Sequence, residues 1–304
     1  LVRRAPVGVT ATDCISDILA LDADVVLHAA RLQPPYDSHD GDICRLLASG
    51  KNVISINGNT FPARWPVERR RRIEEACAKG RSSFMGAGLN PGFAVEKFAV
   101  AATGVCLDVR RVTVSETVLC HEMRSPDYVF DLLGFGSTPG AVDPNADGWP
   151  PGETLNDMFE EVVACIADRL GFQLDGVVRD HRMLPATRDL KVGAGIIVEG
   201  TVSHLDWRWR GVVGGAPVIN LEIAWVMEKA HVDAPSDGLW RIRIDGTPSV
   251  NVLFSLTAPE GYAGKTSLEQ LAVAGAVLNA IPYVVAAPPG AIETPLSTPW
   301  RKPV

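Results

Sequence analysis

The 304-residue sequence lacks the motifs that mark several common classes of enzyme. It has no Gly-x-Ser-x-Gly elbow, no His-Glu-x-x-His helix and no Walker-type phosphate loop. These absences argue against a hydrolase with a nucleophile elbow, a zinc metalloprotease and a P-loop nucleotidase. The Gly-x-Gly-x-x-Gly fingerprint of dinucleotide-binding sheets is missing as well. Cys and His residues have no metal-ligand spacing, so we expect no metal site.

Excess positive charge, paired cysteines and long hydrophobic runs are also absent. A net charge of −7 argues against nucleic-acid binding, and we interpret the one basic run, Arg69–Arg72, as the solvated face of a helix. The six cysteines are scattered, so we expect them to be reduced and mostly buried, as in a cytoplasmic protein. We find no apolar run that could span a bilayer and no signal peptide, and we expect no membrane partner.

What is present, over residues 1–104, is an alternation of short strand and helix patterns. We expect strands at residues 7–10, 24–30, 51–56 and 84–85, and helices at 14–21, 40–49, 66–79 and 93–103. We expect Gly80 to end the third helix, as glycine commonly does. This order predicts parallel strands joined by right-handed crossovers. The segment is therefore expected to be the remainder of a doubly wound, Rossmann-type α/β domain whose first unit precedes Leu1.

The pattern changes after Gly104. We expect a strand at residues 107–118, an irregular stretch at 121–152, a helix at 154–170 and strands at 195–204, 207–213, 218–229, 239–245 and 250–256. An apolar helix at 267–280 and a proline-rich tail follow. We therefore predict an α+β domain with a mixed or antiparallel sheet over residues 105–265. Residues 266–304 are expected to form a C-terminal helix and tail that return to the first domain.

The most informative motif is the turn Gly86-Ala-Gly-Leu-Asn-Pro-Gly-Phe93, between an expected strand and an expected helix. Its glycines allow the backbone to approach a ligand closely, and the helix start offers free N–H groups. This arrangement suits the rim of a nucleotide-binding sheet. A sharp strand-to-helix connection without a ligand is the alternative interpretation.

Polar residues also follow the other expected strands of this sheet. Ligands of open α/β sheets bind beyond the carboxyl ends of the strands, where the sequence places His28, Asn57, Asn59 and Asn90. Asn90 is the best candidate, because its backbone is held between a glycine turn and a proline. His28 fits a buried, hydrogen-bonded strand histidine better than a catalytic one, and Asn57 and Asn59 fit turn positions equally well.

In the second domain, Glu116 projects from an expected strand, and His121, Glu122, Asp127 and Tyr128 crowd into the irregular stretch. A carboxylate or imidazole there could exchange a proton with a substrate, whereas a solvated loop with ordinary charges is the alternative. We interpret four tryptophans as core or interface residues, of which one or two could line a substrate pocket: Trp207, Trp209, Trp225 and Trp240.

Three segments resemble, in order and spacing, the dihydrodipicolinate reductase-like oxidoreductases. They are Asp24-Val-Val-Leu-His-Ala29, Gly50-Lys-Asn-Val-Ile-Ser55 and Gly86–Phe93. Asn279-Ala-Ile-Pro282 and Ala287-Pro-Pro-Gly290 are similar to the subgroup of 2,4-diaminopentanoate dehydrogenases and native amine dehydrogenases.

This resemblance implies an N-terminal Rossmann domain, a homodimer formed through the C-terminal sheet, and NADP or NAD as the cofactor. It implies interconversion of a small amine with an imine, or with a ketone and ammonia. The residues expected near the cofactor are His28, Ala29, Asn57, Gly88, Asn90, Pro91, Gly92 and Asn279. The expected catalytic or substrate contacts are Glu116, Glu122 and Tyr128.

The sequence departs from this group at one functional position. Amine dehydrogenases of the subgroup carry a catalytic glutamate after the strand that matches Asn52–Ile56, and here the stretch reads Asn57-Gly-Asn-Thr60. A carboxylate from elsewhere, such as Glu116 or Glu122, would have to replace it. The alternative hypothesis is a ligand-binding or regulatory protein that uses a dehydrogenase scaffold without a cofactor.

Overall fold

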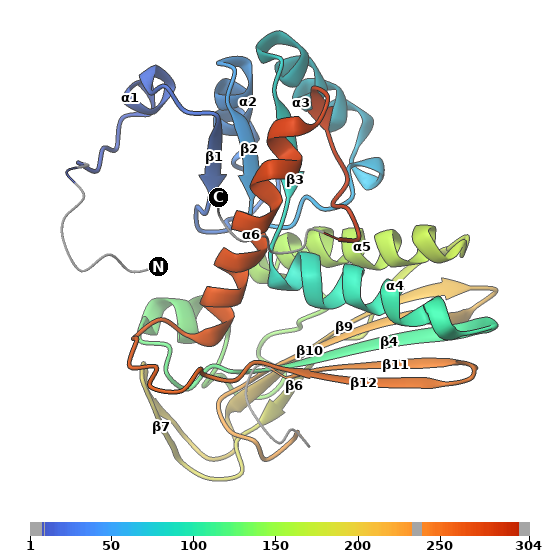
Figure 1. The fold of residues 1–304 in the computed structure, drawn as a ribbon. Coiled ribbons are helices and arrows are strands. Elements are labelled where there is room, and N and C mark those ends of the chain that lie inside the picture. Colours follow the sequence, from blue (N-terminus) through green and yellow to red (C-terminus); the bar gives the residue numbers. More distant parts are fainter. Residues whose placement is uncertain (1–7, 9, 233–238, 298–304) are drawn as a thin grey trace.

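Figure 1 shows a computed structural model of the chain, which describes residues 8, 10–232 and 239–297. Two β-sheets form two layers, and helices α4 (Phe98–Ala102) and α5 (Pro150–Leu170) lie between them. The strand expected at residues 7–10 falls largely outside the described residues. The expected combination of a parallel sheet and a second, mixed sheet is confirmed.

The first sheet is parallel throughout. Its strands, in spatial order, are β1 (Val25–His28), β2 (Asn52–Ser55), β3 (Ser83–Gly86) and β13 (Gly290–Ala291). Its accompanying helices are α1 (Ile15–Ala20), α2 (Asp40–Ala48) and α3 (Val67–Gly80). The side chains of β2 and β3 are almost completely buried, as expected for central parallel strands. The two-residue strand β13 was not expected, because it has no periodicity to detect.

Helix α3 differs from the expectation in two respects. It ends at Gly80, but Arg81, with φ 55°, and not the glycine, occupies the left-handed C-cap position. Gly80 is needed for close packing instead, because a Cβ there would lie 1.8 Å from the carbonyl oxygen of Leu47. Arg69 is not solvated but 5% exposed, and it pairs with Asp40 at 3.0 Å. The 100° turn per residue directs one arginine of the run toward α2.

The second sheet contains seven strands. They are β4 (Asp108–Leu119), β5 (Gly176–Arg179), β6 (Arg182–Pro185), β9 (Val202–Val213), β10 (Ala216–Val226), β11 (Leu239–Thr247) and β12 (Val250–Ser255). The spatial order is β12-β11-β4-β10-β9-β5, and β6 also pairs with β9. The β4–β10 pair is parallel and the others are antiparallel. A separate hairpin joins β7 (Leu190–Val192) to β8 (Gly195–Ile197).

Some boundaries in this half differ from the expectation. Strand β9 runs unbroken through residues 204–207, where two strands were expected, and β5, β6 and β7 were not expected at all. Helix α5 begins earlier than expected, at Pro150. Proline suits the first turn of a helix, because the N–H that it lacks would have no partner there.

Short helical segments complete the fold. They are η1 (Pro62–Arg64), η2 (Leu89–Lys97), η3 (Thr103–Val105) and η4 (Asp127–Leu132). The main core lies between the second sheet and α5, where Trp207 and Trp209 are almost fully buried and stacked in parallel. The interpretation of these two tryptophans as core residues is thereby confirmed.

Helix α6 (Leu268–Ala286) is longer than expected and crosses the first sheet, as Figure 1 shows. Ser267 and Gln270 form a capping box at its start, and the helix continues past Pro282. By length and composition it could cross a membrane, so the expectation that no apolar run reaches that length is wrong. In the fold, Val277 and Ala280 pack into a cluster with residues of β2 and β3.

We expect Gly86→Ala to destabilise the protein strongly, because a Cβ at position 86 would lie 1.9 Å from the carbonyl oxygen of Gly58. The expected loss is about 3 kcal/mol or more of unfolding free energy. Gly275→Ala is the matched control, since its Cβ would meet open space within α6 and should add about 0.5–1 kcal/mol. Urea unfolding measures both. Equal stability of Gly86→Ala and the wild type would contradict this packing.

Candidate active site

The carboxyl ends of β1, β2 and β3 point toward the second sheet (Figure 1). The chain leaves β3 through the glycine turn and enters η2 and α4, which lead directly into β4. The turn that was singled out in the sequence therefore lies where the two layers meet. Parallel α/β sheets bind their ligands at this end.

The turn is held in one conformation by its glycines and by Glu96. Gly92 has φ 127°, a backbone angle that residues with a side chain rarely adopt. A Cβ on Gly88 would lie 2.7 Å from the carbonyl oxygen of Pro91. The Glu96 carboxylate accepts hydrogen bonds from the Gly92 N–H, at 2.6 Å, and from the Thr60 hydroxyl, at 2.7 Å. The turn is thereby attached to the loop that follows β2.

Glu116 lies in the middle of an apolar sheet face. It shares this face of β4 with the buried Val112 and Val114, and its register partners are Ile223 on β10 and Trp240 on β11. Only 8% of Glu116 is exposed, and its carboxylate accepts a hydrogen bond from the Asn90 side-chain amide. Two residues singled out in the sequence, one from each layer, are thus brought together.

The pKa of Glu116 is raised to about 8, chiefly because the carboxyl group is buried. The hydrogen bond from Asn90 opposes this rise, and the nearby Glu269 carboxylate adds to it. The Trp240 indole N–H faces the same carboxylate and also lowers its pKa, although it lies outside hydrogen-bond geometry. Glu116 can therefore gain or lose a proton close to neutral pH. This property is typical of a general acid or base.

Two buried polar atoms beside Glu116 have no partner in the described structure. They are the side-chain oxygen of Asn90, an acceptor, and the indole nitrogen of Trp240, a donor. Such atoms are rare in folded proteins and call for an explanation, of which a ligand is one. Trp240 itself is 1% exposed and packs against Leu89 and Ala94, as the interpretation as a core residue predicts.

A cavity of about 390 Å³ opens beyond the end of β4. Leu119, His121, Glu122 and Glu269 are among the residues that line it. Glu116 itself does not line this cavity, but Glu269, which does, lies close enough to raise the pKa of Glu116. Glu122 is exposed at this cavity, and within the described chain no hydrogen bond joins it to Glu116 or Asn90.

The polar residues after β1 and β2 bind one another. His28 Nδ1 lies 3.1 Å from the Ser55 hydroxyl, which also accepts a hydrogen bond from the Asn57 N–H. Burial lowers the pKa of His28, and His39 lowers it further, which favours a neutral ring. The Asn57 amide donates to the Ala30 carbonyl, at 2.9 Å. These contacts join the two strand ends into one rim.

Three further expected site residues are Tyr128, Ala29 and Asn279. Tyr128, on η4, has the Arg31 guanidinium 4.8 Å above its ring, and burial raises its pKa. This contact links the loop after β1 to the second domain. Ala29 is exposed at the end of β1, and Asn279 is half-buried on α6.

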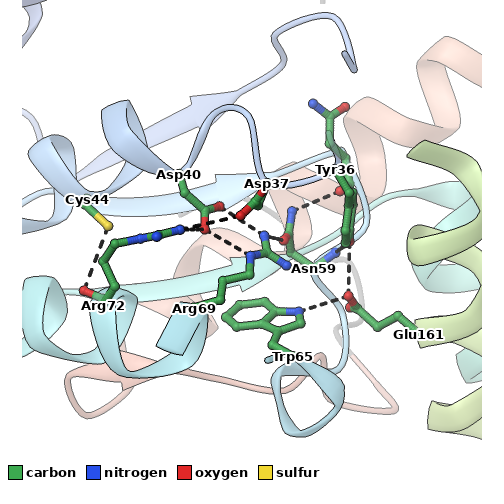
Figure 2. Close-up of polar contacts among 10 residues, drawn as sticks. Tyr36, Asp37, Asp40, Cys44, Asn59, Trp65, Arg69, Arg72 and Glu161 are labelled. Carbon is green, nitrogen blue, oxygen red and sulfur yellow. Dashed lines mark hydrogen bonds and ion pairs between the residues drawn. The ribbon is translucent and has the colours of Figure 1, made fainter. Parts of the chain in front are cut away.

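A buried network that the sequence did not indicate lies behind the rim (Figure 2). Glu161 of α5 is 2% exposed and accepts hydrogen bonds from the Tyr36 hydroxyl, the Phe61 N–H and the Trp65 indole, at 3.1, 2.7 and 2.9 Å. Arg69 lies above the Trp65 ring and joins the network to α3. One signal was available, namely a glutamate within the apolar stripe of an amphipathic helix.

Among the described residues, no group of three or more His, Cys, Asp or Glu side chains could hold a metal ion. The groups that the site presents are a protonatable carboxylate and an amide, with an indole beside them.

We expect Glu116→Gln to gain stability relative to the wild type as the pH rises. The pKa of Glu116 is higher in the folded than in the unfolded state, so the folded state binds more protons and the unfolding free energy falls as the pH rises toward about 8. The loss is at most about 5 kcal/mol and is absent from the glutamine variant. Urea unfolding from about pH 5 to about pH 9 measures the difference. Glu122→Gln controls for loss of an exposed carboxylate, and a difference independent of pH would contradict the burial of Glu116.

No protein-family model matches the chain. The chain is 27% identical, over 308 residues, to an amine dehydrogenase of Streptomyces virginiae. The match covers 95% of this chain and 82% of that protein. It is 25% identical, over 243 residues, to a 2,4-diaminopentanoate dehydrogenase of Acetoanaerobium sticklandii. This match covers 79% of this chain and 64% of that protein.

The fold is similar to a solved structure of an amine dehydrogenase from Mycobacterium smegmatis. The TM-score is 0.74 at 16% identity, and the match covers 98% of this chain and 83% of that chain. The resemblance found in the sequence is confirmed: the chain is a homologue of proteins named amine dehydrogenase and 2,4-diaminopentanoate dehydrogenase, and it has the fold of NAD(P)-dependent oxidoreductases.

Proposed function

We propose that the protein is an NAD(P)-dependent oxidoreductase that interconverts a small amine with its imine, or with a ketone and ammonia. The observation that carries the proposal is the contact between Asn90 and Glu116. It places a carboxyl group that titrates near neutral pH beside the turn at the carboxyl ends of a parallel sheet. The homology to two dehydrogenases named for amine substrates supports the same reaction class.

The residues at the rim fit a nicotinamide cofactor, either NAD or NADP. Asn90, Pro91 and Gly92 would contact the nicotinamide, and His28 and Asn57 the adjoining part of the cofactor. The unpartnered Asn90 side-chain oxygen is an acceptor, and the N–H groups of a carboxamide are complementary donors. When bound, this cofactor supplies or accepts the hydride.

Glu116 is the group that we assign to the proton. Oxidation of an amine to an imine removes a proton from nitrogen, and the reverse reaction returns one. A carboxyl group with a pKa of about 8 can hold or release that proton near neutral pH. The cavity of about 390 Å³ beyond the end of β4, lined in part by Leu119 and Leu256, suits a small and partly apolar substrate.

The homodimer and the compartment are proposals as well. We infer that the dimer forms through the face of the second sheet opposite α5. On that face, Arg208 and Arg210 lie within 4.0 Å of Glu222, and all three side chains are largely or partly buried. The cysteines are free, which suits the reducing cytoplasm.

Cofactor binding is the first test. We expect the full-length gene product to bind NADH or NADPH saturably, because its rim residues fit the nicotinamide portion. Fluorescence titration with each nucleotide measures the dissociation constants and identifies the cofactor. If neither binds, the oxidoreductase proposal fails, and the alternative of a ligand-binding or regulatory protein without a cofactor replaces it.

The assignment of the proton to Glu116 predicts a specific loss of turnover. Glu116→Gln keeps a group of the same size next to Asn90 but cannot exchange a proton, so turnover of amine should fall by about 100-fold or more. The cofactor dissociation constant should stay unchanged. Glu122→Gln is the matched control on the exposed side of the cavity. If the loss appeared in Glu122→Gln instead, the proton would belong to Glu122.

A further inference from the structure

The loop after β2 is attached on one side to helix α5. Glu161 accepts a hydrogen bond from the Phe61 N–H, and it also accepts one from the Tyr36 hydroxyl. The oxygen of this hydroxyl in turn accepts the Asn59 N–H, at 2.7 Å. Glu161, Tyr36 and Asn59 are all at least 90% buried, so water cannot readily replace these bonds. Residues 59–61 are therefore held at a fixed distance from α5.

The same three residues are attached on their other side to the glycine turn. The Asn59 carbonyl accepts the Gly86 N–H at 3.0 Å. The Thr60 hydroxyl donates to Glu96, which also accepts the Gly92 N–H. Both ends of the turn that carries Asn90 are thus bound to residues 59–60.

Packing leaves this connection little room to move. A Cβ on Gly58 would lie 2.4 Å from the Tyr36 hydroxyl oxygen, and one on Gly86 would lie 1.9 Å from the Gly58 carbonyl oxygen. The backbones of the β2 loop and the glycine turn are in contact, with no side chain between them. A shift of residues 59–61 must therefore move the turn as well, because close-packed interiors transmit displacements.

A second set of bonds keeps Asn59 in place. Its side-chain oxygen accepts a hydrogen bond from Arg69, at 2.7 Å, and Arg69 makes two further hydrogen bonds to Asp40, each of 3.0 Å. Figure 2 shows Arg69 between Asp40 and the Trp65 ring. Asn59 has φ 61°, a conformation that needs such support in a residue other than glycine.

We propose that Glu161 is a positioning residue: through residues 59–61 it sets the place of the glycine turn, and thereby of Asn90 against Glu116. This proposal rests on the proposed function. In this proposal, helix α5 of the second domain controls the geometry of the site at the strand ends of the first domain. A displacement of about 1 Å at such a site is enough to reduce turnover by about 100-fold.

Tyr36→Phe tests the proposal, because it removes the hydroxyl between Glu161 and Asn59 and keeps the ring under Arg69. Trp209→Phe is the matched control. It removes a buried indole hydrogen bond to Asn156, also on α5, without touching residues 59–61. Thr60→Val, which breaks the bond to Glu96, interrupts the same connection at its other end and serves if Tyr36→Phe does not fold.

The primary measurement is hydrogen exchange at the amides of residues 86–93 in the protein without ligand. We expect exchange to accelerate about tenfold or more in Tyr36→Phe, corresponding to about 1.4 kcal/mol of local opening, and to stay within about twofold of the wild type in Trp209→Phe. Turnover should fall about 10- to 100-fold in Tyr36→Phe. In Tyr36→Phe, the apparent pKa in the pH profile of kcat/KM should also rise. The hydrogen bond from Asn90 lowers the pKa of Glu116, and a displaced turn weakens that bond.

The outcomes separate the two proposals. If both variants accelerate exchange and slow turnover in proportion to their lost stability, Glu161 is only structural and the inference is overturned. If exchange responds as expected but the wild type binds neither NADH nor NADPH, the connection exists and the proposed oxidoreductase function fails.

Discussion

Buried carboxylates hold the two layers of this protein together, and they differ in the number of hydrogen-bond donors that each receives. Glu161 accepts three hydrogen bonds and Glu96 accepts two, all from the loops that follow β1, β2 and β3. Glu116 accepts one, from Asn90. Burial raises the pKa of each, and donors to the charged form oppose the rise. The pKa of Glu116, which accepts the fewest hydrogen bonds of the three, is raised to about 8.

The first half of the fold could be predicted because its strands are short apolar runs separated by helices with clear ends. The errors there concern what single residues contact. Nothing in the sequence distinguishes Arg69 from its three neighbours, and only the position of α2 determines which arginine meets Asp40. In the second half, β5, β6 and β7 have three or four residues each, too few to show periodicity. Pro282 indicated a helix end that packing against the first sheet overrides.

The candidate site could be predicted in part. Asn90 was found because backbone chemistry, a glycine turn before a proline, is visible in the sequence. Glu116 was singled out because it projects from an expected strand and its carboxylate could exchange a proton, whereas its burial on an apolar face became visible only in the structure. The network around Glu161 could not be found in this way. Tyr36 and Glu161 are separated by 125 residues, and their pairing depends on how α5 docks against the first sheet.

The same network gives a physical reason why the carboxylate that we propose for proton transfer lies elsewhere than the resemblance implies. In this chain the stretch after β2 is neutral, and its Asn59 is 3% exposed, accepting a hydrogen bond from Arg69 and donating one to the Asn57 carbonyl. A carboxylate at position 59 would face the Arg69 guanidinium, which would hold it ionised and direct it away from a substrate. A carboxyl group that exchanges protons near neutral pH needs an apolar environment with few donors. The face of the second sheet around Glu116 provides that environment, and Asn90 connects it to the strand ends of the first.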